Sequence, residues 1–120
     1  TDRFPGFYLA DSGHPVEARV DSPADVAAIM SARRELAVPS ALVVASPLPV
    51  DEQLDPDLHD RVLEEGLAAA KTAHVAGKAV TPFLLDHFHR TTHGASLVVN
   101  ERIILRNAAL AADIAVAACA

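Results

Sequence analysis

Apolar side chains recur at helical spacing in several stretches of the chain, with capping and turn residues between them. The first predicted helix begins at Ser22, a good N-cap followed by Pro23 in the first helical position, and ends near Leu36. The second begins at Asp55, again followed by proline, and runs to about His74. Each helix has one apolar stripe, so each is expected to bury one side against the rest of the fold.

Two more helices are predicted in the second half of the chain. Thr81-Pro82 repeats the capping pattern, and Gly94 marks the following stop. The segment from about Ser96 to Ala118 contains neither glycine nor proline, so we expect one long helix there. Its apolar stripe also carries two asparagines. The stripe comprises Leu97, Asn100, Ile103, Ile104, Asn107, Leu110, Ala111 and Ile114.

Two segments have the pattern of β-strands. Ala41–Ala45 is a continuous apolar run between turn signals, which is typical of a strand buried on both faces. Residues 16–20 alternate apolar and polar side chains and predict a short strand. The proline-rich loop 46–49 follows the predicted strand 41–45. In open α/β sheets, ligands bind at the carboxyl ends of strands, so this loop is a candidate to face a site. The pattern therefore predicts a helix-rich α/β fold.

Composition narrows the classes of function. The chain has 120 residues, of which 51% are hydrophobic, so it forms one domain at most. Its formal net charge is −6 and it has no basic stripe, which argues against nucleic-acid binding and against a polybasic membrane anchor. No apolar run of about 18 residues predicts a transmembrane span. The single cysteine, Cys119, cannot form an internal disulfide, so we expect a cytoplasmic protein.

Asn100 and Asn107 are the most informative polar residues. They lie two helical turns apart on a face that is otherwise apolar. A buried amide without a partner costs about 1–3 kcal/mol, so each side chain needs a partner in the protein or in a ligand. An amide donates and accepts, and therefore matches the imide-like edge of a pyrimidine base. A structural asparagine that binds a neighbouring backbone is the alternative, and the residues alone favour it.

Other candidate sites find less support. His89 and His93 share a helical face, but no third ligand lies nearby, so a structural or exposed role is expected. The acidic residues between positions 51 and 65 are interpreted as a solvated helix start. No nucleophile-elbow serine or glycine-rich phosphate loop is present. The residues alone thus do not define a reaction.

Three blocks of sequence together resemble one family. They resemble the C-terminal portion of pseudouridine-5′-phosphate glycosidases, a group that includes indigoidine-cluster proteins and the alnumycin-type C-ribosylation enzymes. The resemblance covers nearly the whole chain. The blocks are residues 1–8 (TDRFPGFY) with 12–16 and 21–23, residues 77–85 (GKAVTPFLL), and residues 94–100 (GASLVVN) with 107–108 and 111–112.

The resemblance implies an α/β fold with a mostly buried sheet, a homotrimer and a divalent metal, usually Mn²⁺. It implies reversible cleavage of the C–C bond between uracil and ribose 5-phosphate, through a Schiff base between a lysine and the opened sugar. An iminium electron sink suits this bond, since carbon is a poor leaving group. Antibiotic-pathway members join ribose 5-phosphate to other aromatic aglycones. The pattern departs from the family at Arg3, His93, Glu101-Arg102 and Arg106, so an aglycone other than uracil stays open.

The resemblance also implies that much of the active site lies outside this chain. The family's Schiff-base lysine, catalytic glutamate and metal-linked aspartate precede the first block, and neither Lys71 nor Lys78 matches that lysine. Residues 1–120 are thus predicted to be a C-terminal segment whose N-terminal portion is missing or on another chain. Asn100 corresponds to an asparagine near the base pocket. Asn107 and Thr81 are expected to have structural or supporting roles.

A second hypothesis belongs to another class of function. The chain is then a non-catalytic assembly module that completes the core or the oligomer of a split enzyme. This hypothesis predicts that the alanine-rich final helix packs against another chain. It also predicts an exposed apolar surface when the segment is alone.

Overall fold

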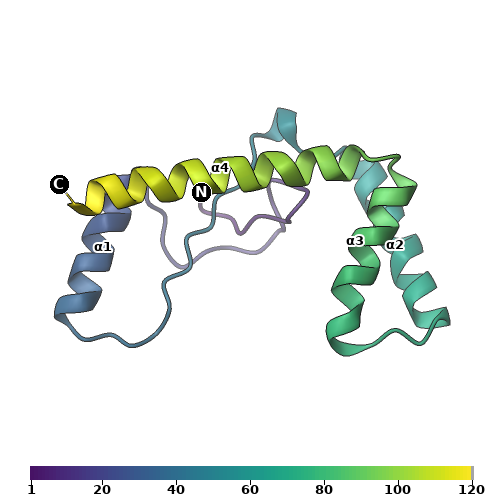
Figure 1. Cartoon of the computed structure of the whole chain (residues 1–120), viewed down its shortest axis with the longest axis horizontal. Coiled ribbons are helices and arrows are strands. Elements are labelled where there is room, and N and C mark those ends of the chain that lie inside the picture. Colours follow the sequence, from purple (N-terminus) through teal and green to yellow (C-terminus); the bar gives the residue numbers. More distant parts are fainter. Residues whose placement is uncertain (120) are drawn as a thin grey trace.

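The computed structural model describes residues 1–119, which form four α-helices and two short 3₁₀ turns (Figure 1). The elements are α1 (Pro23–Glu35), η1 (Val50–Glu52), α2 (Pro56–Thr72), η2 (Gly77–Ala79), α3 (Val80–Thr91) and α4 (Ala95–Cys119). The radius of gyration is 17.1 Å, whereas a compact domain of this length has about 14 Å. The molecule is elongated, with extents of 50 × 30 × 22 Å.

The long helix α4 connects two differently built ends of the molecule. Figure 1 shows α1 against its C-terminal end, and the hairpin of α2 and α3 extending from its N-terminal end. The N-terminal loop and the loop that follows α1 pass between these ends, alongside α4. None of the helices in residues 1–119 combines the length and apolar character needed to cross a bilayer.

The capping residues begin α1 and α2 as the sequence predicts. Ser22 Oγ accepts from the backbone N–H of Asp25 at 3.2 Å, and Asp25 Oδ2 accepts from the N–H of Ser22 at 2.9 Å. This reciprocal capping box satisfies two backbone donors that the helix cannot. Asp55 Oδ1 caps α2 by accepting from the N–H of Leu58 at 2.8 Å. Both predicted N-termini are confirmed, and both C-termini lie within two residues of their predicted places.

The start of α3 differs from the prediction. The helix begins at Val80 directly after η2, and its N-cap, Ala79, offers no capping side chain. Thr81 therefore lies inside the first turn and does not cap it. The 3₁₀ turn η2 precedes Thr81-Pro82 and leads directly into α3. The helix therefore begins before the residues that the sequence predicts as its cap. The last helix, α4, is a single helix as predicted.

The two predicted strands are wrong for this structure. Neither residues 16–20 nor residues 41–45 have regular secondary structure. Beside the first segment there is one isolated bridge, between Arg3 and Pro15, and the N–H of Val16 donates to the carbonyl of Asp2 at 3.1 Å. Leu42, Val43 and Val44 are exposed. A strand requires a neighbour to pair with its backbone, and no other segment of residues 1–119 pairs with residues 41–45. The helix-rich part of the predicted fold class is confirmed, while residues 1–119 contain no sheet.

The hydrophobic core lies where the hairpin meets α4. Its buried members are Tyr8, Leu48, Leu54, Val62, Phe88 and Val99. The rings of Tyr8 and Phe88 pack with centroids 5.0 Å apart. Most of the apolar stripe predicted on α4 is not buried, because Leu97 and Ile104 are exposed and Ile103 is half-buried. Only Ser96 and Val99 of α4 are fully covered.

Candidate functional site

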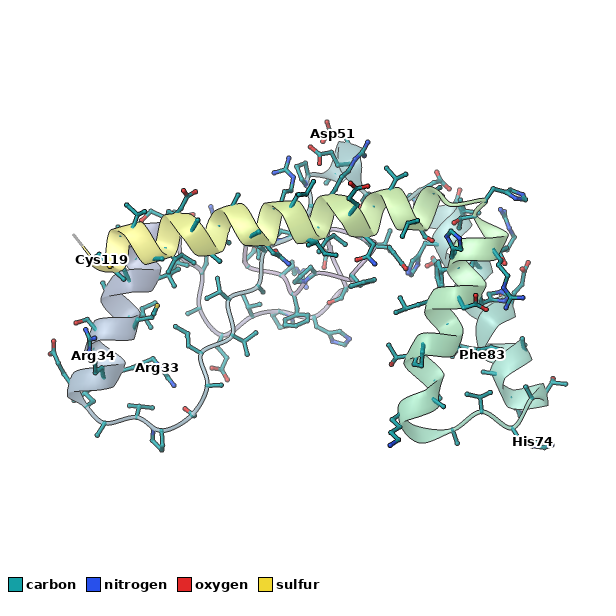
Figure 2. All side chains as sticks on the ribbon, viewed as in Figure 1. Arg33, Arg34, Asp51, His74, Phe83 and Cys119 are labelled. Carbon is teal, nitrogen blue, oxygen red and sulfur yellow. The ribbon has the colours of Figure 1, made fainter. Side chains whose placement is uncertain are left out.

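The candidate site is the region where the middle of α4 meets η1 and the N-terminal loop. We refer to it as the junction, comprising residues 7–10, 50–54 and 96–107. Figure 2 shows Asp51 of η1 beside the middle of α4. The N–H of Leu54 donates to the carbonyl of Tyr8 at 3.0 Å, and the N–H of Ala10 donates to Gln53 Oε1 at 2.8 Å. These bonds hold the N-terminal loop against the residues that follow η1, two segments that are far apart in the sequence.

A two-pronged ion pair ties η1 to α4 at the junction. Arg106 donates from Nη2 to Glu52 Oε1 at 2.6 Å and from Nε to Oε2 at 3.1 Å. Such paired hydrogen bonds fix geometry as well as charge. The Arg106 guanidinium lowers the pKa of Glu52, and the carboxylate raises the pKa of Arg106 in turn. Sequence reasoning assigned Glu52 to a solvated acidic cluster and missed this pair, since no local pattern links residues 54 positions apart.

Tyr8 brings a buried phenol into the junction. Burial raises the pKa of its phenol, and an interaction with the Ser96 side chain partly offsets that rise. The turn between α3 and α4 is fixed nearby. Thr92 Oγ1 donates to the carbonyl of Phe88 at 2.7 Å and accepts from the N–H of Ser96 at 3.0 Å. Tyr8 therefore packs beside the turn that joins α3 to α4, which these two hydrogen bonds hold in place.

Phe7 carries unusual backbone geometry beside Tyr8. Its φ is +63°, in the left-handed region that non-glycine residues rarely adopt. The other non-glycine residues with positive φ among residues 1–119 are Ala37, His74 and His93, each just past the end of a helix. There the left-handed conformation ends the helix. Phe7 has no such role, and its ring packs edge-on against Tyr8 with centroids 4.6 Å apart. Backbone strain of this kind concentrates at functional sites.

The structure places the predicted site residues in different surroundings. Asn100 is half-buried on the second turn of α4, one turn after the buried Ser96. Asn107 is exposed, next to the paired Arg106. Both asparagines belong to the junction. Thr81 does not, because Figure 1 shows the first turn of α3 at the end of the hairpin away from α4. The roles predicted for these three residues remain predictions.

The remaining candidates do not form a catalytic cluster in residues 1–119. Lys71 and Lys78 are exposed at the hairpin tip, the end marked by His74 in Figure 2. His89 and His93 are exposed as well. Within these described positions, no three His, Cys, Asp or Glu side chains come together to hold a metal ion. The manganese implied by the resemblance thus has no complete ligand set here, and we derive no catalytic step through it.

A separate groove lies away from the asparagines. Its volume is approximately 520 Å³, and it opens between the N-terminal loop, α1 and the segment after α1. Phe4, Val20 and Ile29 line one part of it, and residues 40–45 line another. None of Asn100, Asn107 and Thr81 contributes to this lining. The groove and the junction are therefore two distinct surfaces.

Comparison with known proteins identifies the family of the chain. Residues 1–117 match the family model described as indigoidine synthase A like protein. The chain belongs to this family. The match confirms the resemblance drawn from the three sequence blocks.

Two curated relatives have the same functional name. The chain is 62% identical over 121 residues to a pseudouridine-5′-phosphate glycosidase of Salinispora tropica, covering 100% of the chain and 37% of that relative. A pseudouridine-5′-phosphate glycosidase of Saccharopolyspora erythraea is 52% identical over 115 residues, covering 96% of the chain and 38% of the relative. The chain thus spans less than two fifths of the length of these relatives.

A solved structure has the same fold over nearly the whole chain. It is the crystal structure of the prealnumycin C-glycosynthase AlnA in complex with ribulose 5-phosphate. The TM-score is 0.84 at 23% sequence identity, and the match covers 98% of this chain and 39% of that one. The arrangement of α1 to α4 is therefore that of part of a larger enzyme fold.

Proposed function

We propose that this chain is the C-terminal part of an enzyme that cleaves the C–C glycosidic bond of pseudouridine 5′-phosphate, releasing uracil and ribose 5-phosphate. The observation that carries the proposal is the 62% identity to a pseudouridine-5′-phosphate glycosidase, which extends over the entire chain. The complete protein is then of the α/β class, with its sheet built mainly from the part outside this chain.

The same comparison bears on the direction of the reaction. Bond formation with another aromatic aglycone is the alternative within the family, because the solved structure of similar fold is a C-glycosynthase. Its identity of 23% supports only the fold, whereas the glycosidase relatives reach 52% and 62%. Cleavage is therefore the better supported direction.

The residues of this chain indicate which catalytic groups belong to the rest of the enzyme. A nucleophilic lysine that forms a Schiff base needs a site where its neutral amine persists, but Lys71 and Lys78 are exposed. The nucleophile and the proton-transferring acid are thus assigned to the N-terminal portion of the enzyme. This chain supplies the junction, where the half-buried Asn100 presents an amide to the uracil edge. On the family resemblance, the complete enzyme is a homotrimer with a divalent metal.

A chimera tests the activity. The 121 matching residues of the Salinispora tropica relative are replaced by this chain, and release of uracil from pseudouridine 5′-phosphate is followed by chromatography. We expect kcat/KM within about tenfold of the parent relative, a barrier change of about 1.4 kcal/mol. This chain alone is expected to be inactive. A folded chimera without activity would contradict the proposal and favour the assembly-module function, which the exposed apolar side chains of α4 also fit.

Asn100→Ala in the chimera tests the role of the junction. Removing one amide partner of a bound base costs about 1–3 kcal/mol, so affinity for uracil should fall by about 5- to 150-fold. Affinity for ribose 5-phosphate should be unchanged. Both are measured in the reverse reaction or by calorimetry. Asn107→Ala is the comparison variant, and the supporting role expected for Asn107 predicts a smaller loss of uracil affinity than in Asn100→Ala. Equal uracil affinity in Asn100→Ala and the unmodified chimera would exclude the base-binding role.

A further inference from the structure

Phe7 carries an exposed aromatic ring on a strained backbone. Its φ of +63° lies in the left-handed region, where a bulky side chain is a rare outlier. In an extended chain, consecutive side chains point to opposite sides. The left-handed turn at Phe7 instead brings its ring against that of the next residue, Tyr8, with centroids 4.6 Å apart and planes inclined by 67°. The unusual backbone therefore sets where the Phe7 ring lies.

The Phe7 ring keeps free surface although its neighbour is buried. Tyr8 is 5% exposed, whereas Phe7 is 48% exposed. The two rings meet edge-on, so their faces are not stacked on each other. The loop that carries them is fixed, because the N–H of Ala10 donates to Gln53 and the carbonyl of Tyr8 accepts from the N–H of Leu54. Phe7 thus presents a flat apolar surface that is already in place before a ligand binds, which lowers the cost of binding.

Phe7 and Asn100 border the same hydrophobic core. Tyr8 belongs to this core, and its phenol interacts with the side chain of Ser96. Asn100 follows Ser96 by four residues, so their side chains are neighbours on one face of α4. A flat aromatic face and an amide are complementary to a planar heteroaromatic base, because the first stacks on the ring and the second bonds to its edge.

We propose that the ring of Phe7 stacks on the planar aglycone, which makes Phe7 a specificity-determining residue beside Asn100. This inference rests on the proposed function, because it assigns a residue to the aglycone of that reaction. Stacking requires only a flat π surface, so Phe7 accepts uracil and other aromatic aglycones but disfavours a non-planar one. The proposal also gives the strained backbone a purpose, since strain of this kind persists where it positions a functional group.

Substitutions of Phe7 in the chimera with the Salinispora tropica remainder test the stacking. Phe7→Leu keeps an apolar side chain but removes the aromatic face, so the KM for uracil in the reverse reaction should rise by about 5- to 100-fold. The KM for ribose 5-phosphate should change by less than about twofold, because the sugar phosphate has no π face to stack. Phe7→Tyr, which keeps the aromatic face, should hold the uracil KM within about threefold of the unmodified chimera.

Phe4→Leu is the matched control. Phe4 is 47% exposed, close to the value for Phe7, but its ring lines the groove and not the junction. The uracil KM of this variant should stay within about twofold of the unmodified chimera. An equal rise in Phe4→Leu and Phe7→Leu would overturn the proposal, because the effect would then come from the N-terminal loop as a whole.

The unfolding midpoint separates stacking on the aglycone from packing of the ring against the rest of the enzyme. Phe7→Gly removes the ring and also relieves the strain, because glycine adopts positive φ readily. The two effects oppose each other, so the midpoint of the chimera should fall by much less than in Phe88→Ala, which empties a core position. A fall as large as that in Phe88→Ala, with an unchanged uracil KM in Phe7→Leu, would mean that the enzyme itself buries the ring and would overturn the proposal.

The outcomes also separate this inference from the proposed activity. An active chimera whose uracil KM is the same in Phe7→Leu overturns the stacking and leaves the activity standing. An inactive chimera that binds uracil in calorimetry, and binds it more weakly in Phe7→Leu, supports the stacking and contradicts the activity. A folded chimera that neither turns over pseudouridine 5′-phosphate nor binds uracil overturns both.

Discussion

The two ends of α4 are built from different kinds of contact. At its N-terminal end, aromatic and branched side chains from the N-terminal loop, α2 and α3 close around Val99. At its C-terminal end, α1 packs through small side chains, and Val26 is its one buried residue within the described chain. The first end, which we call the closed end, contains the buried core, although Leu97 and Val98 are exposed there. The second, the open end, has no such core and leaves Met30, Leu36 and Val116 exposed.

This difference shows which end of α4 is stabilised by more apolar burial. Burial of apolar area contributes about 25 cal/mol per Å², and alanine side chains have little area to bury. The hairpin end therefore gains more from apolar burial, whereas the α1 end relies on contacts between small side chains of α1 and α4 and on the capping box of α1. The elongated shape, with a radius of gyration of 17.1 Å, agrees with a fold whose hydrophobic core lies at one end.

Phe88→Ala tests the closed end and should have the largest effect. Phe88 is 3% exposed and contacts both Tyr8 and His59 through its ring. Truncating it leaves a cavity, so the free energy of unfolding should fall by about 3–5 kcal/mol, measured by urea denaturation. The control is Phe4→Ala, where the ring is 47% exposed and a loss below about 1 kcal/mol is expected. Equal losses in both variants would mean that the two ends do not differ.

Ser22→Ala tests the open end, with a smaller effect. The variant removes the side chain that caps α1, and the free energy of unfolding should fall by about 1 kcal/mol. Helicity measured by circular dichroism should fall with it. Ser31→Ala, inside the same helix, is the matched control and should be neutral or slightly stabilising. A loss in Ser31→Ala as large as that in Ser22→Ala would assign the effect to helix packing and not to capping.

Arg106→Gln tests the link between η1 and α4 and should have the smallest effect. Arg106 lowers the pKa of Glu52, so the pair stabilises the fold above the ordinary carboxyl pKa. That stability disappears as pH falls through the lowered pKa. Unfolding midpoints of the wild type and the variant should therefore differ at pH 6 and converge once the pH falls below the lowered pKa of Glu52. Because the pair is partly exposed, 1 M NaCl should also reduce the difference. A difference independent of pH would contradict the assignment to Glu52.

The candidate site was only partly predictable. Asn100 and Asn107 stand out in the sequence because they interrupt an apolar stripe, and the structure places both at the junction. The Glu52–Arg106 pair and the buried Tyr8 gave no sequence signal. Both arise from loops that return to α4 from far away in the chain, and such returns follow no local periodicity.

Local chemistry by itself determined where α1 and α2 begin and that α4 is a single helix. Ser22 and Asp55 begin their helices because a side-chain oxygen satisfies backbone donors within three residues, and the absence of glycine and proline after Ser96 lets α4 run unbroken. Tertiary structure alone decided what happens to residues 41–45. Their apolar pattern is that of a strand, but strand hydrogen bonds require a second segment, and none of the residues from 1 to 119 provides it. A helix satisfies its backbone within itself, whereas a strand depends on a neighbour.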